Sequence, residues 1–268
     1  MTPKTDAERS ERLRQLYTGA IADILDELEP TPYRNQCLPP PIRPLLPTMK
    51  VAGPVFTIRA RLRHFDDGVD PRYKQMDMLD AIFPECVIVI EPGDDDAASH
   101  WGELMSNVAI KQGATGAVIH GGLRDAAQVI DLGFPVFTKY FTPATAAYRS
   151  QITDFGVPLL IGGVRVAPGD FVLGDIDGVV VIPGEVVDEV IEKAESVRDR
   201  EHKVRDLLQE GGNIRELFEK YGVFKCLTIS CPTRPSSPLT GRKPRNPPVS
   251  RKPRDSSFPA ASPTMCAT

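Results

Sequence analysis

The sequence lacks the features that mark membrane and secreted proteins. No run of about eighteen apolar residues occurs, which excludes a transmembrane helix. Residues 1–17 are polar and contain no apolar core of a signal peptide. The five cysteines are odd in number and form no CxxC pair, which argues against a disulfide or zinc framework. We therefore expect a cytoplasmic protein that does not contact a membrane.

Several common binding and catalytic signatures are also missing. The chain contains no GxGxxG nucleotide loop, and its four histidines form no HExxH motif or paired metal-ligand spacing. The net charge is −4, and the segment from Cys231 to Thr268 contributes seven Lys or Arg and one Asp, or +6, so the rest carries about −10. Because an acidic body does not favour nucleic-acid binding, we expect no nucleic-acid partner.

The composition is that of a globular domain followed by a tail. Hydrophobic residues make up 41% and charged residues 25% of the 268 residues, enough for a sizeable core without disulfides. The segment from Cys231 to Thr268 is basic and contains nine prolines but few large apolar residues. Such a segment buries too little surface to offset the entropy of ordering. We predict a folded domain at 1–225 and a disordered tail at 226–268.

Periodicity predicts an α/β fold. Thr18 can cap a helix that Pro30 ends, and residues 51–62 alternate as a strand does. Strands and helices then alternate, with Gly113 and Gly133 as helix-ending glycines, which favours βαβ units and a parallel sheet. Short β segments fill 157–183, and a long charged helix follows at 184–211. The remaining predicted elements are helices at 7–17, 73–83, 100–113 and 125–133, and strands at 86–92, 116–122 and 135–140.

Two strand ends in this pattern carry candidate site residues. Ligands of α/β sheets gather at the carboxyl ends of strands. One strand end leads into the helix that begins near Gly102, and the other is followed by Gly121, Gly122, Arg124 and Asp125. If the two units are neighbours, the helix N-terminus faces the Arg-Asp pair.

This arrangement suits a small anion beside a metal ion. The free N–H groups of Glu103, Leu104 and Met105 would point at a carboxylate, and Gly102 allows close approach. Arg124 adds a planar donor fork. Asp125 offers a hard oxygen ligand for Mg²⁺ or Mn²⁺, and Glu103 could hold a metal-bound water.

The same residues have ordinary structural explanations, which spacing alone favours. Asp125 could cap the following helix, and Arg124 could be a surface ion-pair partner. Gly121 and Gly122 could form only a turn. Glu103 in a first helical turn complements the helix dipole.

Other polar residues are weaker candidates. His100 and His120 could line a pocket, although structural roles are expected more often. Residues 94–96 are three aspartates in a loop, which are usually solvated, and Asp170, Asp175 and Asp177 are typical turn residues.

Five segments together resemble the RraA-like family. Its enzymatic branch comprises the class II 4-hydroxy-4-methyl-2-oxoglutarate/4-carboxy-4-hydroxy-2-oxoadipate aldolases. The resemblance implies a β/β/α swivelling-domain sandwich with a long C-terminal helix. It also implies a homotrimer or homohexamer with active sites between subunits. The segments are AIADILDEL (20–28), GELM (102–105), GATGAVIHGGLRD (113–125), PVF (135–137) and PGDFVLGDIDGVVVIP (168–183).

The resemblance also implies residue roles. Asp125 would bind Mg²⁺ or Mn²⁺, and Arg124 would contact the pyruvate part of the substrate. The backbone from Gly102 to Met105 would hold the substrate carboxylate, with Glu103 orienting metal-bound water. Glu201 would reach a neighbouring subunit's site from the long helix. A solvated helix face is an equally good account of Glu201, and Glu192, Glu195 and Glu210 share that region.

These inferences predict a divalent-metal-dependent aldolase. It would cleave small 4-hydroxy-2-oxo acids to pyruvate through an enolate, and oxaloacetate decarboxylation would use the same enolate. One alternative is a non-enzymatic regulator, like the second branch of the family, which acts by protein–protein contact. Another is a different enolate-forming lyase or hydratase of small oxo acids.

Overall fold

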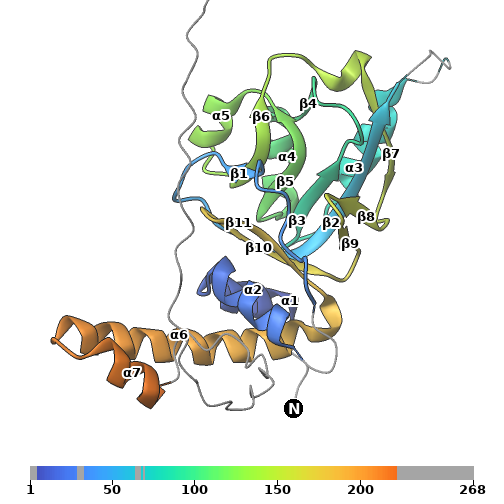
Figure 1. Cartoon of the computed structure of the whole chain (residues 1–268). Coiled ribbons are helices and arrows are strands. Elements are labelled where there is room, and N and C mark those ends of the chain that lie inside the picture. The colour runs from blue at the N-terminus through green and yellow to red at the C-terminus, as the bar shows by residue number, and fades with distance from the viewer. Residues whose placement is uncertain (1–4, 29–32, 64–67, 69, 222–268) are drawn as a thin grey trace, which may run out of the picture. The chain divides into compact units, whose positions relative to one another are not determined.

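The computed structural model describes residues 5–28, 33–63, 68 and 70–221 of the chain (Figure 1). Pro30, His64 and the predicted tail at 226–268 lie outside the described residues, as does the predicted boundary at 225. Within the described ranges, no helix combines the length and apolar character needed to cross a membrane.

The described part of the chain alternates strands and helices through its middle and ends in two helices. The helices are α1 (Asp6–Arg14), α2 (Thr18–Glu27), α3 (Pro71–Asp80), α4 (Glu103–Gln112), α5 (Ala126–Asp131), α6 (Val187–Gln209) and α7 (Ile214–Tyr221), with short 3-10 turns η1 (Ala146–Tyr148) and η2 (Gly184–Val186). The strands are β1 (Arg43–Pro44), β2 (Val51–Leu62), β3 (Val87–Glu91), β4 (Ser99–Trp101), β5 (Gly116–Leu123), β6 (Val136–Phe141), β7 (Ser150–Phe155), β8 (Leu159–Ile161), β9 (Val164–Val166), β10 (Phe171–Asp175) and β11 (Gly178–Ile182).

The main sheet has a parallel centre, as the βαβ pattern predicted. Its strand order is β1-β6-β5-β3-β2-β10-β11, and β2, β3, β5 and β6 pair in parallel. All five residues of β3 are buried, because both faces of the central sheet are covered. β10 and β11 form an antiparallel hairpin on the first half of β2, and β7 pairs antiparallel with its second half.

The proline-rich segment before β2 links the two outer edges of the sheet. The Leu38 N–H donates to the Val179 carbonyl of β11, and the Val181 N–H donates to the Gln36 carbonyl. A few residues later, β1 pairs with β6 at the other edge. The sheet is therefore nearly closed like a barrel, with fewer open edge groups than a flat sheet of this size.

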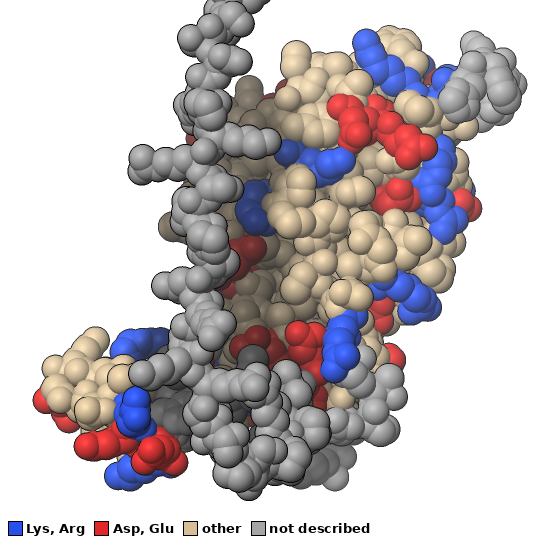
Figure 2. All heavy atoms as spheres, in the orientation of Figure 1, with Lys and Arg blue, Asp and Glu red and all other residues tan. Residues whose placement is uncertain are grey.

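The layers follow a β/β/α order. Helices α3, α4 and α5 cover one face of the central strands, and the β8–β9 hairpin covers the other with β10 and β11 (Figure 1). A third apolar cluster packs α1, α2 and α6 on the outer side of β10 and β11. Figure 2 shows basic and acidic side chains interspersed on the visible face of the described residues.

The long helix α6 packs on the body mainly through its first half. Val187, Val190, Ile191 and Ala194 are buried at the spacing of one helical face. Arg9 and Arg12 of α1 form ion pairs with Asp188 and Glu195, at 2.7 and 2.6 Å. Glu195, one of the alternatives to Glu201, is thus engaged with α1.

Three features differ from the sequence prediction. β7 and α7 were not predicted. The helix expected from residue 100 begins at Glu103, because residues 99–101 form β4 and pair with β5.

The predicted cap of α2 is also wrong. Thr18 is the first helical residue, and the N-cap residue Tyr17 forms no side-chain cap bond. Instead, the Asp175 carboxylate at the end of β10 accepts hydrogen bonds from the Thr18 N–H at 2.9 Å and the Thr18 hydroxyl at 2.8 Å. Asp175 also accepts from the Asp177 N–H, which confirms its predicted role in a turn.

Candidate active site

The two strand ends singled out in the sequence are brought together. β4 pairs in parallel with β5, with Trp101 opposite Leu123, and the Arg124 N–H donates to the Trp101 carbonyl at 3.2 Å. The residues that follow, Gly102 on one segment and Arg124 on the other, therefore lie side by side. This confirms that the N-terminus of α4 faces the Arg-Asp pair.

A buried anchor fixes the start of α4. The Trp101 side chain is fully buried, and its indole N–H donates to the Ser106 hydroxyl at 2.9 Å. The Ser106 hydroxyl in turn donates to the Gly102 carbonyl at 3.0 Å. Because each buried polar atom in this chain of bonds has a partner, the first turn of α4 is held in one orientation.

Asp125 points across to α4 instead of capping its own helix. Its backbone is left-handed, with φ 57°, and its side chain forms no cap bond in α5. The Oδ2 atom lies 3.4 Å from the Glu103 N–H nitrogen and 3.5 Å from Arg124 Nε. Asp125 is therefore the N-cap residue of α5 by position, as expected, but its side chain does not cap that helix, because the left-handed turn aims the carboxylate at the neighbouring helix N-terminus. Aspartate tolerates this conformation better than most residues.

Glycine is required at 102 because the carboxylate lies so close. A Cβ atom there would lie 2.8 Å from Asp125 Oδ2 and 3.3 Å from Arg124 Cγ. The backbone of Gly102 is extended, a conformation open to any residue. Glycine is needed there because it has no side chain, and not because of its conformational freedom.

Gly121 and Gly122 belong to strand β5 and do not form the expected turn. A Cβ atom on Gly121 would lie 2.8 Å from His100 Nδ1, and one on Gly122 would lie 2.5 Å from the Tyr140 ring and 2.6 Å from the Ala98 carbonyl oxygen. The glycines are there because the loop before β4 packs directly on this strand. The turn itself is made by Asp125.

A cavity of about 240 Å³ opens at this point. Gly102, Leu104, Met105, Arg124 and Asp125 all line it, so five of the predicted site residues gather around one space. Its volume suits a small organic acid. The other lining residues are Ile58, Ala60, Pro71, Arg72, Gln75, Ile90, Ser99, His100, Trp101, Thr145, Ala146, Ala147, Ser150, Gln151 and Ile152.

Two predicted site residues are not brought to the cavity within this chain. The Glu103 side chain turns along α4, where its Oε1 accepts from Asn107. Glu201 lies on α6 and accepts a hydrogen bond from the Tyr17 hydroxyl. Its role in a neighbouring subunit's site stays a prediction.

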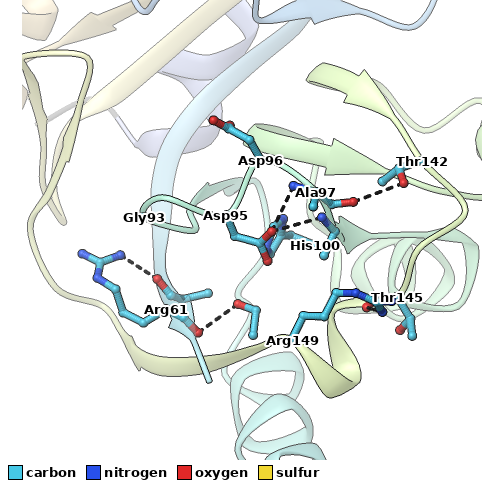
Figure 3. A network of polar contacts seen from close by, with 12 residues as sticks. Arg61, Gly93, Asp95, Asp96, Ala97, His100, Thr142, Thr145 and Arg149 are labelled. Atoms are coloured by element: carbon cyan, nitrogen blue, oxygen red, sulfur yellow. Dashed lines mark hydrogen bonds and ion pairs between the residues drawn. The ribbon is translucent and has the colours of Figure 1, made fainter. Parts of the chain in front are cut away.

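A buried Asp-His pair borders the cavity (Figure 3). Asp95 Oδ1 accepts from the N–H groups of Ala97 and Ala98, and Oδ2 lies 3.1 Å from His100 Nε2. The solvated role expected for all three loop aspartates is wrong for Asp95, because this carboxylate organises the loop from inside. Asp94 and Asp96 are exposed as expected, and Asp96 pairs with Lys139.

The two candidate histidines differ in position. His100 lines the cavity, whereas His120 on β5 is not among its described lining residues. Burial lowers the pKa of both imidazoles, and for His100 the neighbouring Asp95 only partly opposes this. His100 is therefore neutral near pH 7.

The remaining lining residues had little signal in the sequence pattern. Arg72 and Gln75 belong to α3, Ala146 and Ala147 to η1, and Ser150, Gln151 and Ile152 to β7. The Asp70-Pro71 start of α3 is a recognisable cap, since Asp70 accepts from the Arg72 N–H at 3.0 Å. Nothing in the spacing placed that helix beside α4.

The side chains that line the cavity limit which metal ions it could bind. Asp125 is the carboxylate among the described residues of its lining, with 39% of its side chain exposed. Among the described residues, no three His, Cys, Asp or Glu side chains gather closely enough to hold a metal by themselves. This set suits Mg²⁺ or Mn²⁺, which accept one or two carboxylates, waters and substrate oxygens, and does not suit a structural zinc site.

Comparisons with known proteins agree with this geometry. The chain is 28% identical to protein DlpA of Legionella pneumophila over 224 residues, which are 82% of this chain but only 36% of DlpA. It is 30% identical over 213 residues to a Halalkalibacterium halodurans protein named "Putative 4-hydroxy-4-methyl-2-oxoglutarate aldolase", covering 78% of this chain and 93% of that protein. The chain thus spans about a third of one relative and nearly all of the other.

Solved structures share the fold. A Pseudomonas syringae protein described as uncharacterized superposes with a TM-score of 0.70 at 26% identity, over 82% of this chain and 96% of that chain. This confirms the predicted RraA-like α/β fold with a long C-terminal helix. The family model described as RraA-like: Aldolase/RraA matches residues 21–181, more than half of the chain. The chain belongs to the RraA-like family.

Proposed function

We propose that this protein is a divalent-metal-dependent aldolase that cleaves 4-hydroxy-2-oxo acids to pyruvate. One observation carries the proposal. Arg124 and Asp125 lie against the N-terminus of α4 and line one cavity of about 240 Å³. A permanent cation, a carboxylate that could bind a metal and the N-terminus of a helix therefore surround a space that suits a small oxo acid.

The substrate carboxylate would bind at the start of α4. The first N–H groups of a helix have no partner within the helix, and the helix dipole adds positive potential there. Gly102 leaves the backbone open to a close ligand, and Arg124 adds a donor fork from the facing segment. These groups would orient the 2-oxo acid end of the substrate.

Asp125 would hold the metal ion in this cavity, and Glu103 would hold a water beside it once its side chain turns from Asn107 toward the cavity. When bound, a divalent cation stabilises negative charge that develops on the 2-oxo oxygen.

The proposed cleavage forms an enolate, and the site has to stabilise its negative charge. Loss of the 4-hydroxyl proton and cleavage of the C3–C4 bond give a carbonyl product, and the bonding electrons move onto the 2-oxo oxygen. Arg124 donates hydrogen bonds toward that developing charge, as preorganised donors do in other enolate-forming sites. A proton then returns to C3 and gives pyruvate. Decarboxylation of oxaloacetate would form the same enolate and is expected as a second activity.

Assembly into a homotrimer or homohexamer is part of the proposal. Large apolar side chains are exposed near the cavity, with Leu104 at 72% and Tyr148 at 85%, which supports a covering partner surface. A neighbouring copy would then bring Glu201 to the site.

The proposal is tested by pyruvate formation from oxaloacetate and from 4-hydroxy-4-methyl-2-oxoglutarate, with Mg²⁺, Mn²⁺ or EDTA. Asp125→Ala should lower kcat/KM by at least about 100-fold, since it removes the cavity's carboxylate. Asp131→Ala, at the exposed far end of α5, is the matched control and should retain activity.

The outcomes separate the alternatives. Metal-dependent turnover lost only in Asp125→Ala would establish the enolate chemistry. A folded, metal-supplemented protein that turns over neither substrate would instead favour another oxo-acid lyase or a regulator that acts by protein contact.

A further inference from the structure

A buried serine and a buried tryptophan hold the peptide at which α4 begins. Ser106 is fully buried, and its hydroxyl accepts from the Trp101 indole N–H at 2.9 Å. Since a hydroxyl has one proton, that proton is left for the Gly102 carbonyl, 3.0 Å away. The Ser106 N–H donates to the same carbonyl at 3.1 Å. Both described hydrogen bonds to this carbonyl therefore come from Ser106.

These bonds fix a peptide that has no side chain of its own to hold it. A glycine backbone turns more freely than that of any other residue. The Gly102 carbonyl and the Glu103 N–H belong to one planar peptide, so a bond that fixes one group also fixes the other. The Glu103 nitrogen lies 3.4 Å from Asp125 Oδ2, at the cavity. The direction of this donor is therefore set from the buried side of α4.

Trp101 contacts both segments that form the candidate site. Its carbonyl accepts from the Arg124 N–H at 3.2 Å, while its indole donates to Ser106. A helical serine that bonds back to the carbonyl four residues earlier is common, so the bond from Ser106 to Gly102 would be ordinary alone. The indole changes its meaning, because it occupies the hydroxyl as an acceptor and commits the hydroxyl proton to Gly102.

We propose that Ser106 and Trp101 are positioning residues, which fix and polarise the Gly102–Glu103 peptide so that the first N–H groups of α4 face the substrate carboxylate. This inference rests on the proposed function. Hydrogen bonds in a chain strengthen one another, so loss of one bond both loosens and weakens the donor at its end. Neither side chain takes part in bond cleavage.

The test measures KM and kcat for pyruvate formation from 4-hydroxy-4-methyl-2-oxoglutarate at saturating Mg²⁺. Ser106→Ala removes the hydroxyl and should raise KM about tenfold, because the substrate carboxylate loses a well-aligned hydrogen bond. The change in kcat should be less than about twofold, since this carboxylate is bound alike in the ground and transition states. Ser106→Thr keeps the hydroxyl, and its KM should lie closer to that of wild type.

The order of these two variants separates positioning from packing. Ser106 is fully buried, so the larger threonine disturbs its surroundings more than the smaller alanine. Packing alone would make Ser106→Thr the more damaging change, and that order would overturn the proposal. An unchanged KM in folded Ser106→Ala would also overturn it. Ser196→Ala, at an exposed serine of α6, is the matched control and should leave both constants unchanged.

A tryptophan variant decides the matter if the serine variants do not fold. Trp101→Phe removes the indole donor and keeps the bond from Ser106 to Gly102. It should raise KM by a smaller factor than that expected for Ser106→Ala, again with kcat nearly unchanged. Wild-type KM in folded Trp101→Phe would overturn the role of the indole.

An NMR titration with pyruvate and Mg²⁺ separates this inference from the aldolase function. Pyruvate should shift the amide signals of Leu104 and Met105 in wild type, and shift them less in Ser106→Ala at the same concentration. Such shifts without turnover would overturn the aldolase function and support the positioning role. Turnover with equal shifts in both proteins would overturn the positioning role alone. Neither shifts nor turnover in wild type would overturn both.

Discussion

Substituting Gly122 by alanine tests how the cavity is built. The added Cβ would lie 2.5 Å from Tyr140 Cε2, 2.6 Å from the Ala98 carbonyl oxygen and 3.0 Å from Thr142 Cγ2. An ordinary contact begins near 3.4 Å, so the first two atoms would have to move by about 0.9 and 0.8 Å. The Tyr140 ring is not free to do so, because its hydroxyl lies 3.3 Å from the Asp95 carbonyl and 3.2 Å from the Ala98 carbonyl.

The expected cost follows from these contacts. Overpacking a tight site costs about 1–3 kcal/mol, and loss of the Tyr140 hydrogen bonding adds about 1 kcal/mol. Alanine also lowers the conformational entropy of the unfolded chain, which offsets about 0.4–1 kcal/mol of this cost. We expect Gly122→Ala to lower the free energy of unfolding by roughly 2–3 kcal/mol, or Tm by about 4–12 °C for a domain of this size.

Urea unfolding followed by circular dichroism measures this difference. Gly19→Ala is the control, because Gly19 is an exposed residue of α2 whose nearest atoms to an added Cβ lie 3.7 Å away. It should be neutral or stabilising by up to about 1 kcal/mol. If Gly122→Ala unfolds at the wild-type midpoint, the close packing of the loop on β5 is refuted.

Two further predictions concern stability. Asp175→Ala should cost about 1–2 kcal/mol in urea unfolding, because the N–H and hydroxyl of Thr18 both lose their acceptor; a change below about 0.3 kcal/mol would show that water replaces the cap. Burial lowers the pKa of His100 from its ordinary 6.5, so the unfolded state binds more protons below that pH, and stability should fall as the pH drops through 6.5. In His100→Asn the decline in unfolding free energy between about pH 7.5 and pH 5 should be smaller, and an unchanged slope would contradict a neutral, buried His100.

The sequence predicted those elements whose signals are local. β2 spans the predicted residues 51–62, because apolar alternation along one strand needs no knowledge of its partners. The helix ends near Gly113 and Gly133 were likewise predictable, and both glycines are left-handed, with φ of 86° and 67°. β7 was not predicted. Its residues are mostly half-buried, so apolar and polar residues alternate only weakly along it. Pairing with β2 stabilises the strand instead.

In the candidate site, likewise, some features could be predicted from the sequence and others could not. The motif around Gly102 and the Arg124-Asp125 pair was visible in the sequence, because strand ends and helix starts have characteristic residues. The direction of the Asp125 side chain was not, since capping its own helix and facing α4 fit the same sequence. The parallel pairing of β4 with β5 decides between them by placing Gly102 against the carboxylate.

By itself, the sequence determined the alternating α/β pattern, the family resemblance and the residues at the start of α4. Only the tertiary structure decided that Asp95 is buried beneath the loop, that Asp175 caps α2 and that Arg72 shares a cavity with Arg124. Asp175 and Arg72 meet residues of other elements, and the burial of Asp95 depends on how its own loop packs on β5. A side chain's burial and partners depend on the packing of all the elements around it, and local residue patterns do not specify that packing.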